Sequence, residues 1–271
     1  MKTVTTPNAQ HCYTTGSSGN RLHYLDYGGS GRPLVAMHGV TGHAWNWYKV
    51  AAGLTDHRRV YALDFRGYGE SQWSADDAYT TADHVADLGA LLDSLGEAQV
   101  DLIGSSWGAL VAIQYASENP ARVGHLIVVD VEPSFEQAET DLFPRPTSYT
   151  NTDEVTAGEA QRNPNATPEM VAMMTATGYG PAPNGALVPK HDSFFFERWP
   201  FRSDDHWERL AAIQAPTLLL HAANSFVRAD VMGDMASRIP DASLVEVADS
   251  GHVVPVENPA GIVAAAVSFL P

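Results

Sequence analysis

Cysteine is nearly absent from this sequence, which has Cys12 and no other among its 271 residues. One thiol cannot form a disulfide within the chain, so a fold held by internal disulfides is excluded and Cys12 is interpreted as incidental. Long apolar runs are also missing. No stretch approaches the roughly 20 residues that a membrane-spanning helix needs, and residues 1–10 lack the apolar core of a secretion signal. These absences predict a soluble, cytoplasmic protein.

Positive charge is scarce as well. Lys and Arg number 16 against 32 Asp and Glu, which gives a formal net charge of −16. Such a surface repels nucleic acid and anionic membranes, so neither is expected as a partner. Hydrophobic residues make up 44% of the chain, enough to form the core of one large globular protein.

Short apolar runs alternate with helical patterns along the chain. Between the runs, Val85, Leu88 and Leu92 recur at helical spacing, and residues 262–270 repeat this pattern after Pro259. The runs are nearly continuous in hydrophobicity, as expected of parallel strands that are covered on both faces. The alternation predicts an α/β fold with a doubly wound, mostly parallel sheet. The apolar runs are residues 34–37, 60–63, 100–103, 126–129 and 217–220.

This alternation stops between about residues 134 and 205, where no clear strand occurs. A helix start at Thr167-Pro168 and a later aromatic cluster indicate a helical cap inserted over the sheet. We predict core residues 1–133, a cap or lid at 134–207, and a second core segment at 208–271. The large cap side chains either form the cap's own core or line an apolar substrate pocket.

The strongest functional signal is the motif Gly104-Ser105-Ser106-Trp107-Gly108, which lies between an apolar run and a helix-compatible stretch. A Gly-x-Ser-x-Gly in that context describes a nucleophile elbow, a turn whose central residue has a strained backbone. Side chains two positions away would collide with the neighbouring backbone, and glycine relieves that crowding. The motif predicts Ser106 as a nucleophile at the amino end of a helix.

A serine hydroxyl becomes a strong nucleophile only when a base takes its proton. His252 is the best candidate, because it follows apolar residues 244–247 and precedes the last helical pattern. The backbone N–H groups of Val40, in a glycine-rich segment, and of Trp107 are predicted to form the oxyanion hole. His38 has no second ligand at a standard metal-site spacing, so neither a metal nor a cofactor is expected.

Together with three further segments, these motifs resemble the α/β-hydrolase superfamily, in its capped esterase-like branch. The segment that begins at His38-Gly39 is similar to that branch's oxyanion segment, residues 64–71 to its next loop, and Gly251-His252 with Glu257-Asn258-Pro259 to its histidine loop. The resemblance covers nearly the whole chain. It implies the fold and the nucleophile–base pair but not the substrate, because the superfamily includes esterases, lactonases, carbon–carbon bond hydrolases, aminopeptidases and some receptors.

The acid that orients the histidine departs from this resemblance. Most relatives carry it after the strand that corresponds to residues 217–220, where this chain has no carboxylate at Asn224 or Ser225. Some relatives carry it after the preceding core strand, and there this chain has Asp130. The resulting chain order of nucleophile, acid and base is that of the superfamily. We predict Asp130 as the acid, and the alternatives left open are Glu132, Asp230 and Asn224.

A serine at the elbow indicates acyl transfer to water, whereas the superfamily's epoxide hydrolases and haloalkane dehalogenases use an aspartate there. The leading prediction is hydrolysis of a small-molecule carboxylic ester or lactone through a Ser106 acyl-enzyme. A carbon–carbon bond hydrolase, a proline-type aminopeptidase and, in another class, a ligand-binding receptor or inactive relative are the alternatives. No oligomeric state is predicted. The candidate substrate-binding residues are Trp45, Met170, Met174, Phe195 and Trp199.

Overall fold

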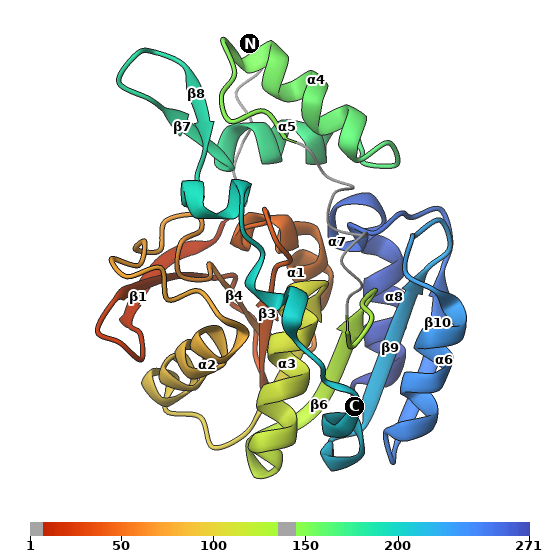
Figure 1. Cartoon of the computed structure of the whole chain (residues 1–271). Coiled ribbons are helices and arrows are strands. Elements are labelled where there is room, and N and C mark those ends of the chain that lie inside the picture. Colours follow the sequence, from red (N-terminus) through yellow and green to blue (C-terminus); the bar gives the residue numbers. More distant parts are fainter. Residues whose placement is uncertain (1–7, 135–144) are drawn as a thin grey trace.

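An eight-stranded sheet forms the centre of the molecule, for which a computed structural model describes residues 8–134 and 145–271. Its strands are β1 (Gln10–Thr15), β2 (Arg21–Asp26), β3 (Pro33–Met37), β4 (Arg59–Leu63), β5 (Val100–Ser105), β6 (Val123–Val129), β9 (Thr217–Ala222) and β10 (Ala242–Val247). They lie in the order β1-β2-β4-β3-β5-β6-β9-β10 (Figure 1). The pairings of β1 with β2 and of β2 with β4 are antiparallel, and every later pairing is parallel. The predicted doubly wound, mostly parallel α/β fold is confirmed.

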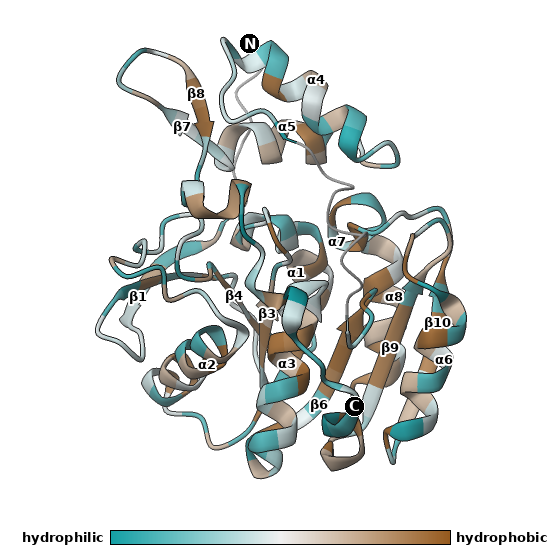
Figure 2. Cartoon of the chain, in the orientation of Figure 1, coloured by the Kyte–Doolittle hydropathy of each residue, from teal (hydrophilic) through white to brown (hydrophobic). Residues whose placement is uncertain are grey.

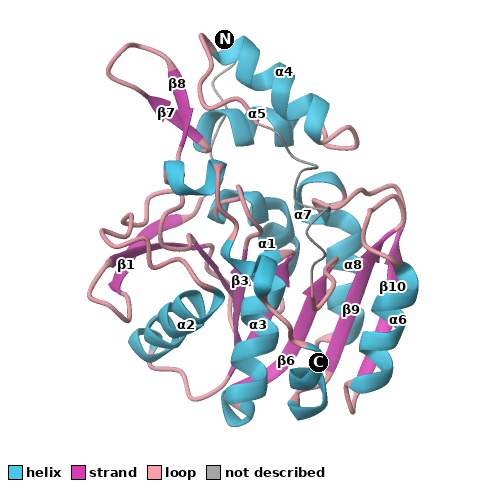
Figure 3. Cartoon of the chain, viewed as in Figure 1, coloured by secondary structure: helices cyan, strands magenta, loops and turns pink. Residues whose placement is uncertain are grey.

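Helices cover both faces of this sheet (Figure 3). One face carries α2 (Thr81–Leu95), α3 (Trp107–Glu118) and α6 (Ala229–Arg238), and the other carries α1 (Tyr48–Leu54) and α8 (Pro259–Phe269). The short α7 (Val254–Glu257) precedes α8. Within residues 8–134 and 145–271, no helix combines the length and apolar character needed to cross a lipid bilayer.

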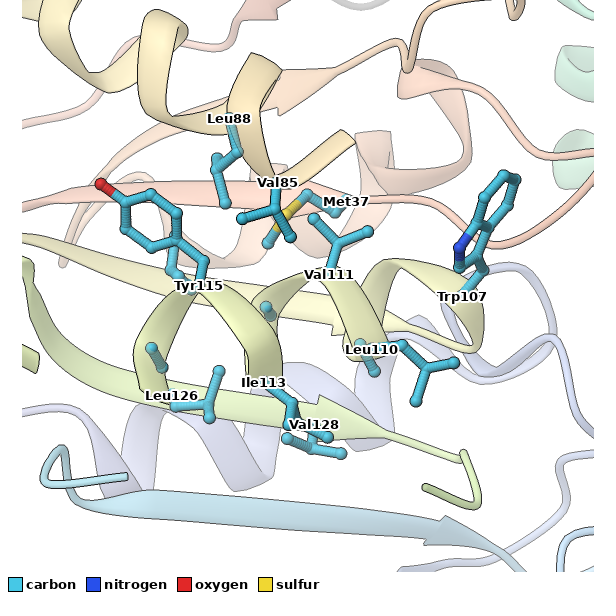
Figure 4. Packing of buried hydrophobic residues seen from close by; sticks show 14 of the residues in the cluster. Met37, Val85, Leu88, Trp107, Leu110, Val111, Ile113, Tyr115, Leu126 and Val128 are labelled. Atoms are coloured by element: carbon cyan, nitrogen blue, oxygen red, sulfur yellow. The ribbon is translucent and has the colours of Figure 1, made fainter. Parts of the chain in front are cut away.

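The core consists of two hydrophobic layers separated by the sheet. Successive residues of β3 alternate between them: Val35 and Met37 belong to the layer under α2 and α3, and Leu34 and Ala36 to the layer with α1 and α8. Because both faces are covered, the central strands are hydrophobic on both sides (Figure 2). Figure 4 shows side chains of α2, α3, β3 and β6 packed together in the first layer.

Helix α3 is the most enclosed element, since each of its residues from 107 to 116 is buried. A helix that is apolar all round is found inside a protein rather than on its surface. Here α3 contacts β5, β6 and α2. The residue at its amino end is therefore fixed relative to the ends of the central strands.

The part of the chain from residue 149 to 196 lies over the carboxyl edge of the sheet (Figure 1). It contains α4 (Thr152–Arg162), α5 (Pro168–Thr177) and a separate hairpin of β7 (Tyr179–Pro181) and β8 (Leu187–Pro189). The side chain of Thr167 accepts a hydrogen bond from the N–H of Met170, so α5 begins where the sequence predicts a helix. Residues 135–144 of the predicted cap lie outside the described residues, and the division into core and cap segments stays a prediction.

A buried carboxylate after β4 joins the loops at this edge. Asp64 accepts hydrogen bonds from the N–H of Ala44 at 2.6 Å and of Glu70 at 3.0 Å, and its Oδ2 lies 2.6 Å from Nδ1 of His23. Burial alone would raise the pKa of Asp64, but the hydrogen bond from His23 and the charges of neighbouring histidines outweigh it and lower the pKa to about 2. The ionised form of Asp64 therefore stabilises the folded state.

We expect Asp64→Asn to lower the free energy of unfolding at neutral pH by about 2 kcal/mol, because each pKa unit corresponds to about 1.4 kcal/mol. The pKa of Asp64 is depressed in the folded state from 3.8 to about 2. Its contribution is thus complete above about pH 4 and is lost as the pH falls through 2. Urea unfolding of both proteins across this range measures the difference. Asp234→Asn, an exposed position on α6, is the control, and a difference that does not shrink in acid contradicts the prediction.

Candidate active site

The carboxyl ends of the parallel strands bring the predicted site residues together. Ser106 follows β5, Asp130 follows β6, and His252 lies on the loop after β10. The loop after β3, which contains Val40, reaches the same edge. Ligands of open α/β sheets bind at this edge.

Ser106 has the backbone conformation expected of an elbow. Its φ is 53° and its ψ −123°, a combination that is strained for any residue with a side chain. A Cβ atom on Gly104 would lie 2.2 Å from the carbonyl oxygen of Gly108, and one on Gly108 would lie 2.3 Å from that of Met37. Both glycines are therefore required sterically, and the turn holds the Ser106 hydroxyl toward the cavity described below.

Three side chains form a continuous hydrogen-bonded chain. Nε2 of His252 lies 2.9 Å from Oγ of Ser106, and Nδ1 of His252 lies 2.8 Å from Oδ2 of Asp130. With Asp130 ionised, Nδ1–H donates to the carboxylate, which leaves Nε2 to accept the hydroxyl proton. The arrangement can remove a proton from Ser106 and stabilise the resulting imidazolium.

Asp130 is held firmly in this position. Its side chain is fully buried, Oδ1 accepts from the N–H of Ala222 at 2.8 Å, and Oδ2 accepts from the Ser225 hydroxyl at 2.5 Å. A carboxylate that accepts several hydrogen bonds is stabilised in its charged form and fixed in orientation. Ser225 is one of the two positions after β9 where the resemblance leads us to expect a carboxylate. Its hydroxyl instead donates a hydrogen bond to Asp130.

The other acids considered from the sequence lie elsewhere. Glu132 accepts from the backbone N–H of Arg228 at 3.0 Å and from its guanidinium at 3.1 Å. Asn224 is exposed and donates its backbone N–H to Ser250, and Asp230 is exposed in the first turn of α6. Within residues 8–134 and 145–271, none of these three side chains hydrogen-bonds the imidazole, whereas Asp130 does.

Two backbone N–H groups belong to residues near Ser106, since Trp107 follows it in sequence and Val40 lines the same cavity. In the described part of the chain, those of Val40 and Trp107 have no hydrogen-bond acceptor. The N–H of Trp107 is at the first position of α3, where the helix itself offers no partner. A Cβ atom on Gly39 would lie 2.9 Å from that of Ser106, so only glycine allows this close approach. Both N–H groups are available to an oxyanion formed at Ser106.

A buried histidine fixes the loop that carries Val40. Nε2 of His38 accepts from the N–H of Phe65 at 3.1 Å, and its Nδ1 lies 2.7 Å from the carbonyl oxygen of Gly39. Burial lowers the pKa of His38, which keeps the imidazole neutral and suits one donated and one accepted hydrogen bond. His38 positions the loop.

A cavity opens above the serine. It encloses about 930 Å³ of empty space, part of which is continuous with solvent. Ser106, His252 and Val40 form part of its wall. Much of the remaining lining is apolar and comes from Trp47, Met174, Trp199, Phe201, Phe226 and Pro255.

Only some of the predicted substrate-binding residues line this cavity. Met174 and Trp199 do, whereas Trp45, Met170 and Phe195 are buried in the hydrophobic core instead. Trp45 packs edge-on against Tyr27, with ring centroids 6.2 Å apart. In the 3₁₀ helix η1 (Ala44–Trp47), residues two apart point in different directions, so Trp47 reaches the cavity and Trp45 does not.

Local packing also explains why Met170 and Phe195 do not line the cavity. Met170 precedes Met174 by one turn of α5 and is enclosed by the core layer that contains α1. Phe195 stacks on Tyr68 with ring centroids 4.4 Å apart. The sequence analysis also missed Phe226 and Arg145, which line the cavity from segments without secondary structure. No periodic pattern marks either residue.

Metal coordination has no ready-made site in the part of the chain that the structure describes. No three His, Cys, Asp or Glu side chains there come close enough together to hold an ion.

Comparisons with known proteins identify related chains. The N-formylmaleamate deformylase of Pseudomonas putida is 29% identical over 263 residues, which cover 94% of each chain. An esterase of Mycobacterium tuberculosis is 26% identical over 257 residues, covering 88% of this chain and 83% of that protein. The crystal structure of an E-2-(acetamidomethylene)succinate hydrolase matches with a TM-score of 0.88 at 22% identity, over 97% of this chain and 99% of that one.

Other relatives match over shorter stretches. Among them are proteins named epoxide hydrolases, which match about half of this chain and less than half of their own length. The model of one family, described as the alpha/beta hydrolase fold, matches residues 32–259. That match includes the strand–serine–helix elbow, the loop after β3 and His252. The chain therefore belongs to the alpha/beta hydrolase fold family, a family of enzymes.

Proposed function

We propose that this protein is a serine hydrolase that cleaves a carboxylic ester or lactone through an acyl-enzyme on Ser106. The observation that carries the proposal is the chain of hydrogen bonds from Ser106 through His252 to Asp130. The backbone N–H groups of Val40 and Trp107 have no acceptor among the described residues, and Ser106 and His252 line a largely apolar cavity. Each part needed for acyl transfer is present on one edge of the sheet.

In the first half-reaction, Nε2 of His252 takes the proton of Ser106 as Oγ bonds to the substrate's carbonyl carbon. The carbonyl oxygen becomes an oxyanion and accepts hydrogen bonds from the N–H groups of Val40 and Trp107. Asp130 stabilises the imidazolium through Nδ1–H. When the carbon–oxygen bond of the leaving group breaks, His252 donates its proton to the departing alkoxide, and an acyl ester remains on Ser106.

In the second half-reaction, water replaces the alcohol. His252 removes a proton from the water, the new oxyanion occupies the same N–H groups, and the Ser106 oxygen leaves with the proton returned by His252. The products are a carboxylic acid and free enzyme. A lactone follows the same path, except that its alcohol remains attached to the acyl group until the second step releases the hydroxy acid.

The relatives support acyl hydrolysis at different levels of detail. The full-length relatives include a protein named an esterase, which fits ester cleavage. Others are named epoxide hydrolases. The superfamily's epoxide hydrolases use an aspartate at the elbow, whereas this chain has a serine there. The main cavity is lined by Arg145 and, among the described residues, by no carboxylate. This composition disfavours an aminopeptidase, which must hold an ammonium group.

A second candidate is cleavage of an N-acyl bond. It is favoured by the relative named N-formylmaleamate deformylase, which matches over 94% of both chains. The same residues serve this reaction, with His252 donating its proton to a nitrogen leaving group. Rates on 4-nitrophenyl esters, lactones, N-formyl amides and vinylogous diketones, measured side by side, separate ester, amide and carbon–carbon bond cleavage.

We expect Ser106→Ala to lower kcat on 4-nitrophenyl butyrate by a factor on the order of 10⁴ or more, because no other group then forms the acyl-enzyme. The unfolding transition should persist. Ser117→Ala on the same helix, where the hydroxyl donates to a carbonyl of its own helix, is the matched control and should keep the wild-type rate.

A serine-directed organophosphonate tests the same assignment without a known substrate. We expect stoichiometric labelling of Ser106, identified by mass spectrometry of peptides. Appreciable hydrolysis by Ser106→Ala argues against the assignment. Absence of labelling together with tight binding of a small molecule indicates a receptor instead.

We expect Asp130→Asn to lower kcat by about 10⁴-fold, because the imidazolium loses its counter-charge and an amide N–H favours the wrong tautomer of His252. Glu132→Gln is the control, since Glu132 pairs with Arg228 and should affect kcat little. Single-turnover acylation rates of both variants measure the effect. Near-normal rates in Asp130→Asn with loss in Glu132→Gln reverse the assignment of the acid.

A further inference from the structure

Arg145 lies where two cavities meet. It lines the cavity above Ser106 and also a smaller one of about 360 Å³ under the β7–β8 hairpin. Thr41, Asn46 and Met174 line both cavities as well, so the two spaces adjoin. A ligand group at Arg145 therefore occupies the same chamber as an acyl group at Ser106.

The guanidinium of Arg145 has no partner in the described part of the chain. Its Nε atom is buried without a hydrogen bond, and the side chain makes no ion pair with the described residues. Other buried arginines of this protein differ. Nε of Arg58 lies 2.7 Å from Asp101, and Nε of Arg66 lies 2.6 Å from Asp87. The Nε of Arg162 is also buried without a hydrogen bond, but the guanidinium of Arg162 pairs with Glu159. Arg145, which is half-buried, differs from these three arginines because it has no carboxylate partner among the described residues.

The nearby carboxylate is already occupied. Glu159 of α4 accepts from the Arg162 guanidinium at 2.7 Å, from the Asn163 amide at 3.3 Å and from the Tyr179 hydroxyl. No ion pair joins it to Arg145. Among the described residues, no carboxylate lines the main cavity, and Glu159 lines the smaller one. The charge of Glu159 acts on Arg145 from nearby, but within residues 8–134 and 145–271 no carboxylate forms an ion pair with the guanidinium.

An enclosed, unpaired cation is energetically unfavourable, since desolvation of an ion is costly unless a counter-charge replaces the water. Burial is the main influence on the pKa of Arg145 and lowers it below its ordinary value. A guanidinium nevertheless stays protonated at neutral pH. The site is thus prepared for an anion that reaches it from the cavity.

The surroundings fit a single negative charge. Burial lowers the pKa of His43 to about 4 and also lowers that of His191, so both imidazoles of the smaller cavity are neutral at pH 7. Lys190, on the same cavity, pairs with Glu70 at 2.6 Å. One uncompensated guanidinium therefore faces the ligand, and its planar pair of donors matches a carboxylate.

We propose that Arg145 binds a carboxylate of the substrate, so that the compounds hydrolysed are monoanions such as half-esters or half-amides of dicarboxylic acids. This inference rests on the proposed hydrolysis at Ser106 for the reaction but not for the binding. The apolar side chains of the main cavity contact the carbon chain between the carboxylate and the scissile carbonyl. Arg145 then selects among acyl compounds that the nucleophile alone would treat alike.

Matched substrates test the selectivity. The rates kcat/KM are measured for the monoethyl esters of succinate, glutarate and adipate and for the neutral analogues in which an amide replaces the carboxylate. We expect the wild type to favour at least one half-ester over its amide analogue by about 100-fold. Arg145→Gln should remove most of this preference, because it lowers the rate on the half-ester far more than the rate on the neutral analogue. Arg198→Gln, a cap arginine that is 65% exposed, should match the wild type.

Stability distinguishes binding from a structural role. Because Arg145→Gln removes a half-buried cation that has no ion pair with the described residues, its Tm should equal or exceed that of the wild type. A structural arginine gives a lower Tm and equal losses on charged and neutral substrates. Either that result or a wild type without preference for half-esters overturns the proposal.

Binding can be measured apart from hydrolysis. In the Ser106→Ala background, calorimetry with monoethyl glutarate and monoethyl succinate should show binding that weakens at least tenfold when Arg145→Gln is added. Absence of Arg145-dependent binding overturns this proposal even if esters are cleaved. Arg145-dependent binding without turnover by the wild type supports it while contradicting the proposed hydrolysis.

Discussion

The imidazole of His252 contacts residues at the ends of two strands, β5 and β6, that are both remote from His252 in the sequence. It contacts Ser106 at 2.9 Å and Asp130 at 2.8 Å, across separations of 146 and 122 residues. Neither contact is possible unless β5, β6 and β10 end at one edge in the observed order. The register of the parallel sheet, the burial of α3 and the loop after β10 are all needed to make this bridge.

Most residues with strained backbone conformations lie near the contacts that His252 makes with Ser106 and Asp130. Of the non-glycine residues with positive φ in the described chain, Thr41, Ser106, Asp130 and Asp249 lie in the turns or loops after β3, β5, β6 and β10, and Asp77 lies in the longer loop after β4. Each such conformation costs roughly 1–3 kcal/mol and persists only where the surroundings enforce it. At Thr41, Ser106 and Asp130 the two-layer core supplies that enforcement, because the ends of β3, β5 and β6 that lead into these turns are buried on both faces.

The fold was predictable because parallel strands covered on both sides must be apolar throughout, and the runs at residues 34–37 and 100–103 show this directly. The position of Ser106 in a tight turn could be predicted because Gly104 and Gly108 flank it. A side chain at either position would collide with the neighbouring backbone. Asp130 could be predicted as the partner of His252 because the loop after β9 lacks a carboxylate. In the structure its Oδ2 lies 2.8 Å from Nδ1 of His252. In each case a short local pattern has one physical explanation.

The cavity lining was less accessible to sequence reasoning. Whether Trp45 or Trp47 faces the ligand depends on the pitch of a single 3₁₀ turn, and Met170 differs from Met174 by one helical turn. Arg145 carries no pattern at all, since its environment is assembled from the loop after β3, α4 and the β7–β8 hairpin. Such positions are set by tertiary packing, which residue spacing does not encode.

The location of the carboxylate after β6 has a consequence for the neighbouring loop. Residues 223–226 after β9 need contribute only the Ser225 hydroxyl to Asp130, while Phe226 lies against the ring of His252, with centroids 4.4 Å apart, and forms part of the cavity wall. In the proposed mechanism, this loop therefore does not have to supply the carboxylate that orients His252. Its length and its apolar residues are thus open to evolutionary change or to directed libraries, which can reshape the ligand chamber while the proton-transfer geometry stays intact.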